Sequence, residues 1–365
     1  MKTEQSEDES TGTKSDQIQY DHSMDLVYAN QFSVDYYTEG YIHIHIEDGN
    51  EYVIVPDGKE KRNLGLQDVT YISQNSDSIY LAASSVMDLF RQMQGLDKVK
   101  ACSTTSDDYS MQEIKDRIND GLITYVGKYS GPDYEALLGM ECNLAIESTM
   151  IYRTPEIKEQ LEKLGIPVFV DRSSYEGEPL GRLEWIKLYS VLLGKEEEAE
   201  AFFEEKRRAV EELEEKLAEA KEDREEKTVV FFYITSNGYV NVRKPGDYLS
   251  KMIKMAGGGY ALENLDFDEN ALSTMNINWE DFYREAKDAD ILIYNGTIDG
   301  GIKSIDDLIS KNELFNDFKA VKEKNVWSTN LNMYQETSKI TDIIQDLYYV
   351  INEDGVETEY MNKLK

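Results

Sequence analysis

A long helical pattern at the centre of the chain, between two halves of strand–helix alternation, limits the folds available to this sequence. Leu180–Glu226 contains no proline, and Gly194 is its clearest turn signal. Its second part, Lys195–Glu226, is about thirty residues, which as a helix is a rod of about 45 Å. Apolar residues recur through the stretch at helical spacing: Trp185, Leu188, Tyr189, Leu192, Ala199, Phe202, Phe203, Val210, Leu213 and Leu217.

A rod of this length can connect two domains, and 365 residues fit two domains better than one core. We therefore predict an α/β protein with two Rossmann-like lobes, mostly parallel sheets and one long bridging helix. A ligand would bind in the cleft between the lobes. The expected parts are a disordered tether (1–17), an N-terminal extension with a β-hairpin (18–66), an N-terminal α/β lobe (67–180), a helical bridge (181–226) and a C-terminal α/β lobe (227–365).

Short apolar runs separated by helical patterns predict the elements of each part. Tyr41–Ile46 and Tyr52–Val55 alternate around Asp48-Gly49-Asn50, which predicts the hairpin. In the first lobe we expect strands at Val69–Ile72, Lys98–Cys102, Thr124–Val126, Asn143–Ile146 and Val168–Val170, and helices at Ser78–Met93, Met111–Asn119, Asp133–Leu138 and Pro155–Leu164. In the second we expect strands at Thr228–Ile234, Tyr239–Val242, Asp290–Tyr294 and Asn325–Ser328, and helices at Tyr248–Ala256, Trp279–Ala286, Glu313–Phe318 and Ile340–Ile351.

The charge of −33 argues against two classes of partner. A nucleic-acid-binding protein needs a basic face, and adsorption to anionic lipid needs one too. The acidic residues do not indicate a cationic substrate, because most fall on helix faces that solvent would cover. The sequence has no apolar run of transmembrane length and no apolar signal-peptide core. For Cys102 and Cys142, free thiols are favoured and a disulfide is the alternative in an exported protein.

Catalytic and metal-binding signatures are missing. The chain has no G-x-S-x-G, P-loop, dinucleotide fingerprint or H-E-x-x-H, and only three histidines. His43 and His45 would share one face of a strand, which permits half a metal site but favours an ordinary hairpin face. Asp266-x-Asp268-x-Asn270 begins like a calcium loop but lacks its glycine and final glutamate, so a solvated turn is favoured.

Candidate ligand contacts come from the loops that follow strands, where ligands bind in open α/β sheets. Tyrosine offers these loops a rigid apolar face with one hydroxyl, and the chain has 25 tyrosines. Arg153, Arg172 and Arg243 stand at strand ends or loop starts, where a guanidinium can hold a carboxylate, hydroxamate or catecholate oxygen through two hydrogen bonds.

Four stretches carry a family resemblance. Residues 172–204 read RSSYEGEPLGRLEWIKLYSVLLGKEEEAEAFFE, and three further stretches follow the same family pattern: Val69–Lys98, KMIKMAGGGYALEN at 251–264 and LFNDFKAVKEKNVWSTN at 314–330. In this order the chain resembles the substrate-binding lipoproteins of ABC importers for iron-siderophores, haem and vitamin B12, and it is most similar to Gram-positive members. The resemblance spans about Asp68–Ile351.

This resemblance implies a two-lobed fold bridged by one helix, with modest closure on the ligand. It also implies that one acidic residue on each lobe docks onto permease arginines. By position these are Glu135 in PDYEALLGMECNLAI and Glu280 in INWEDFYREAKDADILI. The chain departs from the family in its longer N-terminal extension and in lacking the lipid-carrying cysteine, which we expect upstream of residue 1.

Our leading hypothesis is an extracytoplasmic, lipid-anchored, monomeric binding protein that catalyses nothing. It would have no resident cofactor, would bind an iron-siderophore, haem or a corrinoid such as cobalamin, and would deliver it to the permease subunits of an importer. The expected ligand contacts are Tyr109, Met150, Tyr152, Arg153, Arg172, Tyr175, Tyr233, Asn237, Arg243, Asn330 and Tyr334, with Trp327 as a further aromatic face. An enzyme on the same scaffold and a cell-surface interaction module remain the alternatives.

Overall fold

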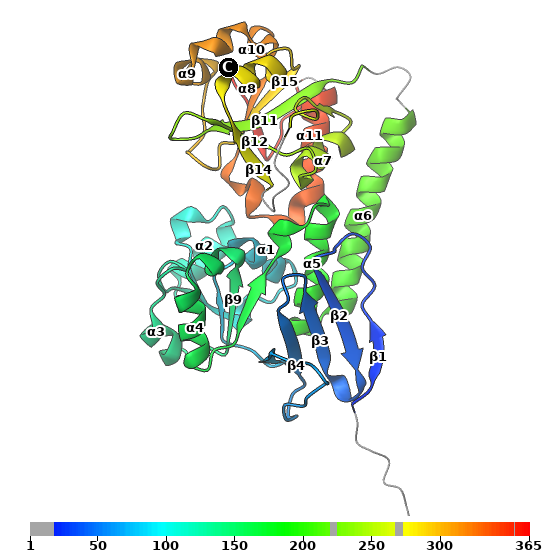
Figure 1. Cartoon of the computed structure of the whole chain (residues 1–365), viewed down its shortest axis with the longest axis vertical. Coiled ribbons are helices and arrows are strands. Elements are labelled where there is room, and N and C mark those ends of the chain that lie inside the picture. Colours follow the sequence, from blue (N-terminus) through cyan, green and yellow to red (C-terminus); the bar gives the residue numbers. More distant parts are fainter. Residues whose placement is uncertain (1–17, 220–224, 267–272, 354) are drawn as a thin grey trace, which may run out of the picture.

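The computed structural model describes residues 18–219, 225–266, 273–353 and 355–365. Three sheets organise these residues: an N-terminal sheet, the sheet of the first lobe and the sheet of the second lobe. Figure 1 shows the second lobe above the other two, with one long helix running along the side of the molecule. The tether expected at 1–17 and most of the calcium-like turn at 266–270 lie outside the described residues.

The N-terminal sheet is larger than the expected hairpin. Its five strands run in the order β1-β2-β3-β4-β5, and each neighbouring pair is antiparallel except β4 and β5, which are parallel. The strands are β1 (Tyr20–Ser23), β2 (Phe32–Tyr37), β3 (Ile42–Ile46), β4 (Glu51–Val55) and β5 (Val69–Ser73). The prediction that Val69–Ile72 opens the first lobe was therefore wrong. An apolar run does not reveal which sheet it will join, since that choice depends on strand partners distant in sequence.

The first-lobe sheet is entirely parallel, in the order β10-β9-β6-β7-β8. Its strands are β6 (Ile79–Leu81), β7 (Val99–Cys102), β8 (Thr124–Tyr125), β9 (Leu144–Ser148) and β10 (Val168–Asp171), and its helices are α1 (Ser84–Gln92), α2 (Gln112–Asn119), α3 (Tyr134–Gly139) and α4 (Pro155–Lys163). The expected helix Ser78–Met93 is instead the strand β6 followed by α1. Ile79, Tyr80 and Leu81 are fully buried, as a central parallel strand requires.

The central stretch forms two helices, because Gly194 adopts a left-handed conformation (φ 64°) and ends the first. These helices are α5 (Pro179–Leu193) and α6 (Glu196–Glu219). In Figure 1, α5 lies between the lobes, and α6 runs from beside the N-terminal sheet towards the second lobe. The bridge is therefore a pair of packed helices, of which α6 is the rod.

The second-lobe sheet is mixed, in the order β14-β12-β11-β15-β16-β17, with β13 beside β11. Its strands are β11 (Thr228–Ile234), β12 (Val240–Arg243), β13 (Gly259–Tyr260), β14 (Thr274–Ile277), β15 (Ile291–Tyr294), β16 (Val326–Thr329) and β17 (Met361–Lys363). Its helices are α7 (Tyr248–Met255), α8 (Trp279–Ala286), α9 (Ile305–Lys311), α10 (Lys319–Lys322) and α11 (Ile340–Asn352). The segment expected as a helix at Glu313–Phe318 is a 3-10 helix, η7 (Glu313–Asp317).

The two cysteines are free thiols, as favoured from the sequence. Cys102 ends β7, whereas Cys142 lies two residues before β9 rather than in a strand. Within the described ranges, no helix has the length and apolar character needed to cross a bilayer.

Candidate ligand-binding cleft

The first-lobe sheet directs attention to the carboxyl ends of β6 and β9. The chain leaves β6 towards β7 on one side, and it returns to β9 on the other, so the connections diverge between these two strands. In open parallel sheets this divergence marks the ligand crevice. Ser84 and Ser85, in the first turn of α1 after β6, and Thr149, after β9, stand here and line two neighbouring pockets between the lobes.

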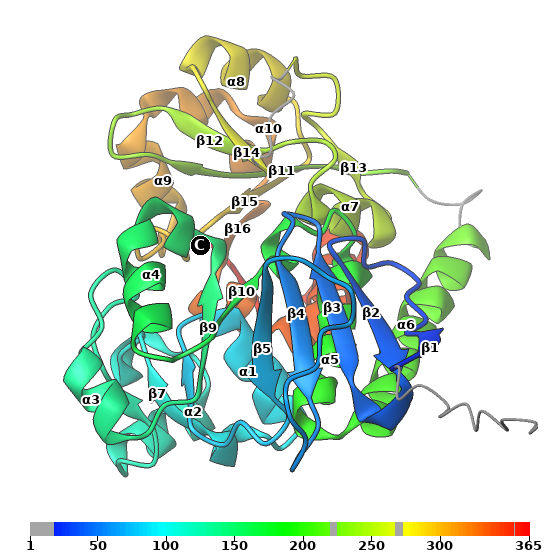
Figure 2. The same ribbon diagram turned by 60° about the horizontal axis from the view of Figure 1, so that its bottom comes forward.

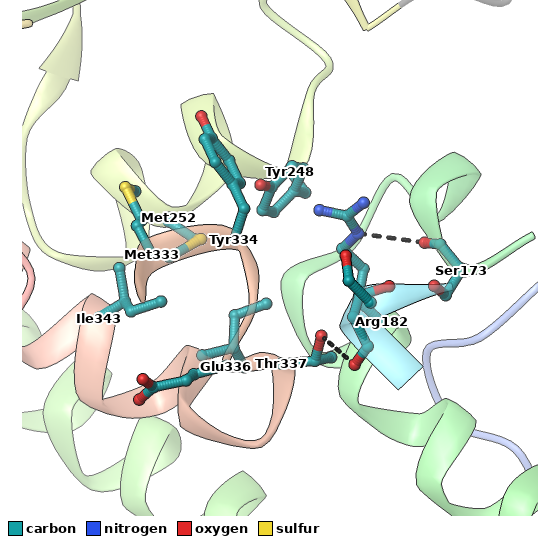
Figure 3. Close-up of a pocket in the computed structure, with 12 residues that line it drawn as sticks. Ser173, Arg182, Tyr248, Met252, Met333, Tyr334, Glu336, Thr337 and Ile343 are labelled. Atoms are coloured by element: carbon teal, nitrogen blue, oxygen red, sulfur yellow. Dashed lines mark hydrogen bonds between the residues drawn. The ribbon is translucent and has the colours of Figure 1, made fainter. Parts of the chain in front are cut away.

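The inner pocket has a volume of about 200 Å³. Its polar and apolar sides are distinct: Met252, Met333 and Ile343 lie opposite Arg182 and Ser173 (Figure 3). The complete lining is Ser84, Ser85, Ser173, Arg182, Tyr248, Met252, Met333, Tyr334, Glu336, Thr337, Ile340 and Ile343. Because both lobes contribute side chains, the pocket exists only when the lobes are packed together.

The outer pocket has a volume of about 360 Å³ and shares Tyr248 with the inner one. Its first-lobe wall is Ser174, Tyr175, Glu176 and Gly177, together with Thr149. Its second-lobe wall is Lys244, Gly246, Asp247, Tyr248 and Ser273. The two adjoining pockets are lined by tyrosines and hydroxyl groups, by the cationic side chains of Arg182 and Lys244, and by the carboxyl groups of Glu176, Asp247 and Glu336.

Arginine side chains stack on the tyrosines of the cleft. The guanidinium of Arg182 lies 4.0 Å from the ring centre of Tyr248, so a residue of the bridging helix α5 contacts α7 of the second lobe. Its Nε donates to the carbonyl of Ser173 (3.1 Å). The guanidinium of Arg172 lies 4.2 Å from the ring centre of Tyr175. Stacked guanidinium groups keep their in-plane donors available for a ligand.

Arg243 is held between Tyr334 and Asp247. Its Nη2 donates to the Tyr334 hydroxyl (2.5 Å), and its Nη1 lies 3.8 Å from a carboxylate oxygen of Asp247. Burial alone would lower the pKa of Arg243, but Tyr334 and Asp247 outweigh it and raise that pKa. Burial also raises the pKa of Asp247, despite the neighbouring Arg243. The cleft thus keeps a permanent cation and disfavours the charge of its buried acid.

Of the residues expected to contact ligand, two line the pockets: Tyr175 the outer one and Tyr334 the inner one. Arg243 lines neither pocket but donates to the Tyr334 hydroxyl. Arg172 lies behind Tyr175 rather than in the lining itself.

The remaining candidates lie elsewhere. Tyr109 is 2% exposed, within the first-lobe core. Tyr152 donates to Asp48 at the hairpin turn (2.6 Å), which turns its hydroxyl towards the N-terminal sheet. Asn330 donates to the carbonyl of Glu359 (2.6 Å) and lines a separate pocket beside β17. The others line neither pocket: exposed Met150 and Arg153 near β9, half-buried Tyr233 and exposed Asn237 at the end of β11, and buried Trp327 on β16.

Several cleft residues were not foreseen, chiefly Ser84, Ser85, Arg182, Lys244, Tyr248, Met252 and Met333. Arg182 and Tyr248 stand inside helical patterns, where an amphipathic reading assigns them to a helix surface. One signal was available for Tyr248: Asp247 precedes it and caps α7 by accepting from the Leu249 N–H (3.0 Å). That places Tyr248 at a helix start, where a side chain can face a cleft.

The two expected docking glutamates occupy equivalent positions on the two lobes. Glu135 and Glu280 are exposed in the first turns of α3 and α8. Asp133 and Asn278 cap those helices through side-chain oxygens. Their role in docking stays a prediction.

His43 and His45 both contact Glu51 on the neighbouring strand, at 2.5 Å and 2.8 Å. The part of the chain that the structure describes contains no cluster of metal-ligating side chains that would hold an ion.

Two lobes, a bridge between them and a lined cleft at their interface define a two-lobed binding protein. Residues 81–330 match the sequence profile of the periplasmic binding protein family, and the chain belongs to that family. Members are binding proteins, not enzymes, so the alternative of an enzyme on this scaffold is set aside.

Two solved structures share the fold of this chain. A haem-binding periplasmic protein from Pseudomonas aeruginosa is 15% identical, with a TM-score of 0.61 over 79% of this chain and 98% of that chain. The petrobactin-binding protein YclQ from Bacillus subtilis is 12% identical, with a TM-score of 0.63 over 87% and 100%. At such identities the likeness shows the fold alone.

A curated relative is the uncharacterized lipoprotein MJ0878 of Methanocaldococcus jannaschii, which is 26% identical over 251 residues. The match covers 67% of this chain and 56% of that protein. The chain thus spans about half the length of the curated relatives it matches.

Proposed function

We propose that this chain is the extracytoplasmic substrate-binding component of an ABC importer. It captures an anionic metal chelate, such as an iron-siderophore or haem, or a corrinoid, in the cleft between the lobes. It then delivers this ligand to the permease subunits as a monomer. A lipid anchor at the outer face of a Gram-positive cell membrane completes the proposal; the similar protein MJ0878 is named a lipoprotein.

The side chain of Arg182 is the main reason to expect an anionic ligand. It is half-buried, lines the inner pocket and stacks on Tyr248. Neighbouring cations form ion pairs, Arg243 with Asp247 and Lys251 with Glu178, whereas Arg182 takes part in none of the ion pairs among the described residues. Asp171 and Asp247 interact with Arg182 electrostatically at longer range, but among the described residues no carboxylate forms an ion pair with it. A partly desolvated guanidinium without a directly paired carboxylate favours an anion as its partner.

The apolar side of the inner pocket supports a ligand of mixed polarity. Met252 and Met333 are polarizable and conform to irregular shapes, and Ile343 adds a flat aliphatic surface. Tyr175, Tyr248 and Tyr334 offer ring faces and hydroxyls to the same ligand. An organic chelate with an apolar body and anionic oxygens matches both sides, whereas a bare metal ion matches neither.

Delivery requires a surface that both lobes share. Glu135 and Glu280 are exposed and lie on different lobes, so two basic contacts on a permease would fix the orientation of the protein. The test is stimulation of ATP hydrolysis by candidate importers in proteoliposomes. Charge reversal at both positions should remove stimulation while leaving ligand affinity unchanged.

Ligand capture is tested by titrating the purified protein with ferric hydroxamates, ferric catecholates, haem, cobalamin and free metal ions. Tryptophan fluorescence and ligand absorbance report binding. We expect saturable, sub-micromolar binding of one chelate class, weakened by Tyr248→Ala because this ring borders both pockets. Tyr20→Ala, on the exposed strand β1, is the matched control. A folded protein that binds none of these ligands would favour the surface-interaction alternative.

A further inference from the structure

The N-terminal sheet lies against the edge of the first-lobe sheet that borders the cleft. β10 is an edge strand, paired only with β9, so one row of its backbone groups lacks a strand partner. The hydroxyl of Tyr52, on β4, accepts the Val170 N–H of that edge (3.1 Å). The Tyr52 ring lies 4.6 Å from that of Phe169. Figure 2 shows the N-terminal sheet beside the first lobe and α5.

The loop between β1 and β2 holds the chain just beyond β10. The carboxylate of Glu176 accepts the backbone N–H groups of Asn30 (3.1 Å) and Gln31 (3.0 Å) and the indole N–H of Trp185 (2.9 Å). The side-chain oxygen of Gln31 accepts from Nε of Arg172 (2.7 Å). Two contacts therefore bracket the segment 172–176.

The turn of the hairpin approaches the same segment from the other side. A carboxylate oxygen of Asp48 lies 3.9 Å from Nη1 of Arg172 and accepts from the Tyr152 hydroxyl (2.6 Å). Asn50 donates to that hydroxyl (2.8 Å). The Asp48 side chain is 13% exposed because it turns inwards onto Arg172 and Tyr152, although the turn itself lies at the surface.

We infer that the N-terminal sheet is a structural part of the ligand site. Through Gln31 and Asp48 it fixes Arg172 against Tyr175, and through the loop at 30–31 it fixes Glu176. Because Tyr175 and Glu176 form the first-lobe wall of the outer pocket, the extension sets the shape and charge of that wall. Gln31 and Asp48 are positioning residues, and the inference rests on ligand capture in the cleft as proposed above.

The main test compares Gln31→Ala with Gln19→Ala, the same substitution at an exposed site of the same extension. The probes are haem and a ferric tris(catecholate), titrated by fluorescence and absorbance. Loss of one positioning hydrogen bond should weaken binding of the probe that the wild type binds by about five- to tenfold. Gln31→Glu keeps an oxygen that accepts from Arg172, so this variant should bind the probe as tightly as the wild type does. Binding by Gln31→Ala equal to wild type would overturn the inference.

A double-mutant cycle separates positioning from general weakening of the fold. If Gln31 acts through Arg172, its substitution should have no further effect on binding in an Arg172→Met background. An undiminished effect there would contradict the assignment. The same comparison is repeated at the hairpin turn. Asp48→Asn is the test variant, and Glu47→Gln, at an exposed neighbouring position, is its control.

A readout without ligand keeps this inference separate from the proposed function. Hydrogen exchange of the backbone amides at 172–177 should quicken in Gln31→Ala and Asp48→Asn but not in Gln19→Ala or Glu47→Gln. If the wild type binds neither these probes nor the hydroxamate and cobalamin of the wider panel, but exchange quickens as expected, the ligand proposal fails and the positioning stands. If binding occurs and exchange is unchanged, the positioning by the N-terminal sheet is refuted.

Discussion

α5 and α6 are joined at Gly194, yet their surroundings are opposite. Almost every side chain of α5 is buried, including the charged residues Glu184 and Lys187. In α6 the buried side chains are Ala199, Phe203, Val210 and Leu213, and the rest of the helix carries acidic residues towards solvent. The comparison teaches that α6, in which apolar and charged residues alternate most clearly, is the long solvent-exposed helix. α5, in which this alternation is weak, forms the centre of the molecule.

The buried charges of α5 are satisfied by chain that is distant in sequence. The Glu184 carboxylate accepts the backbone N–H groups of Val27 (2.9 Å), Tyr28 (2.8 Å) and Ala29 (2.8 Å). Lys187 lies 3.2 Å from Glu184 and 2.8 Å from Glu200 on α6. In α6, Arg207 pairs with Glu204 and Glu211 within one helix. Such pairs on a partly solvated helix face contribute little to stability, whereas a fully buried network is costly to break.

The largest effect should follow removal of the central carboxylate of α5. Glu184→Ala leaves three backbone N–H groups without their acceptor, so we expect a loss of about 3–5 kcal/mol in the free energy of unfolding. Glu204→Ala on α6 should cost less than about 0.5 kcal/mol. Urea unfolding of both variants measures the difference, and comparable losses would mean that burial does not distinguish the two helices.

Ligand binding provides the second contrast between the helices. Arg182→Met keeps the apolar stem and removes the unpaired cation, so the affinity for the chelate identified by titration should fall at least about tenfold. Arg207→Met removes a paired cation from α6 and should leave affinity unchanged. If both variants bind equally well, Arg182 does not hold the ligand.

The glycine between the helices should have a smaller effect. A Cβ at Gly194 would have nothing within 4 Å, so Gly194→Ala meets only the left-handed backbone (φ +64°). We expect a loss of about 1 kcal/mol in thermal unfolding. Gly139, the last residue of α3, also has open space around it and no left-handed φ, so Gly139→Ala should instead stabilise by up to about 0.5 kcal/mol. A neutral Gly194→Ala would mean that the helix junction can relax.

The pH dependence of stability should differ in sign between acids near the two helices. Burial raises the pKa of Glu176 above 4.5, so its contribution to stability is complete at lower pH and falls as pH rises through the raised value. The hydrogen bond from Arg207 lowers the pKa of Glu204, so its contribution is present above pH 4.5 and lost in acid. Urea midpoints of Glu176→Gln and Glu204→Gln, compared with wild type from about pH 3 to 6, should diverge in opposite directions: the Glu204 difference changes below pH 4.5 and the Glu176 difference above it.

Most of the lobe architecture could be predicted from local patterns. Predicted strands such as Thr228–Ile234 and helices such as Trp279–Ala286 coincide with β11 and α8. The predictions failed or were incomplete where the place of a strand depends on pairing with strands that are distant in sequence. β5 joins the N-terminal sheet through β4, and β14 and β17 pair antiparallel at the edges of the second-lobe sheet.

The site was harder to predict than the fold. Tyr175 and Tyr334, predicted because they stand in loops that follow strands, line the pockets, and their contact with a ligand stays a prediction. Tyr109 has the same type of position but packs into the core. Arg182 and Tyr248 come from helices, and they meet only because α5 packs against α7. No sequence spacing predicts the contact between Arg182 and Tyr248.

The sequence by itself determined the fold class, the helical centre and the family, because helical periodicity, apolar strands and segment order are local properties of the chain. Only the tertiary structure decided which tyrosines and arginines face the cleft, and that the N-terminal extension packs on its rim. The physical reason is that burial and hydrogen bonding depend on groups distant in sequence: besides Lys187 on its own helix, the buried carboxylate of Glu184 needs the backbone N–H groups of residues 27–29.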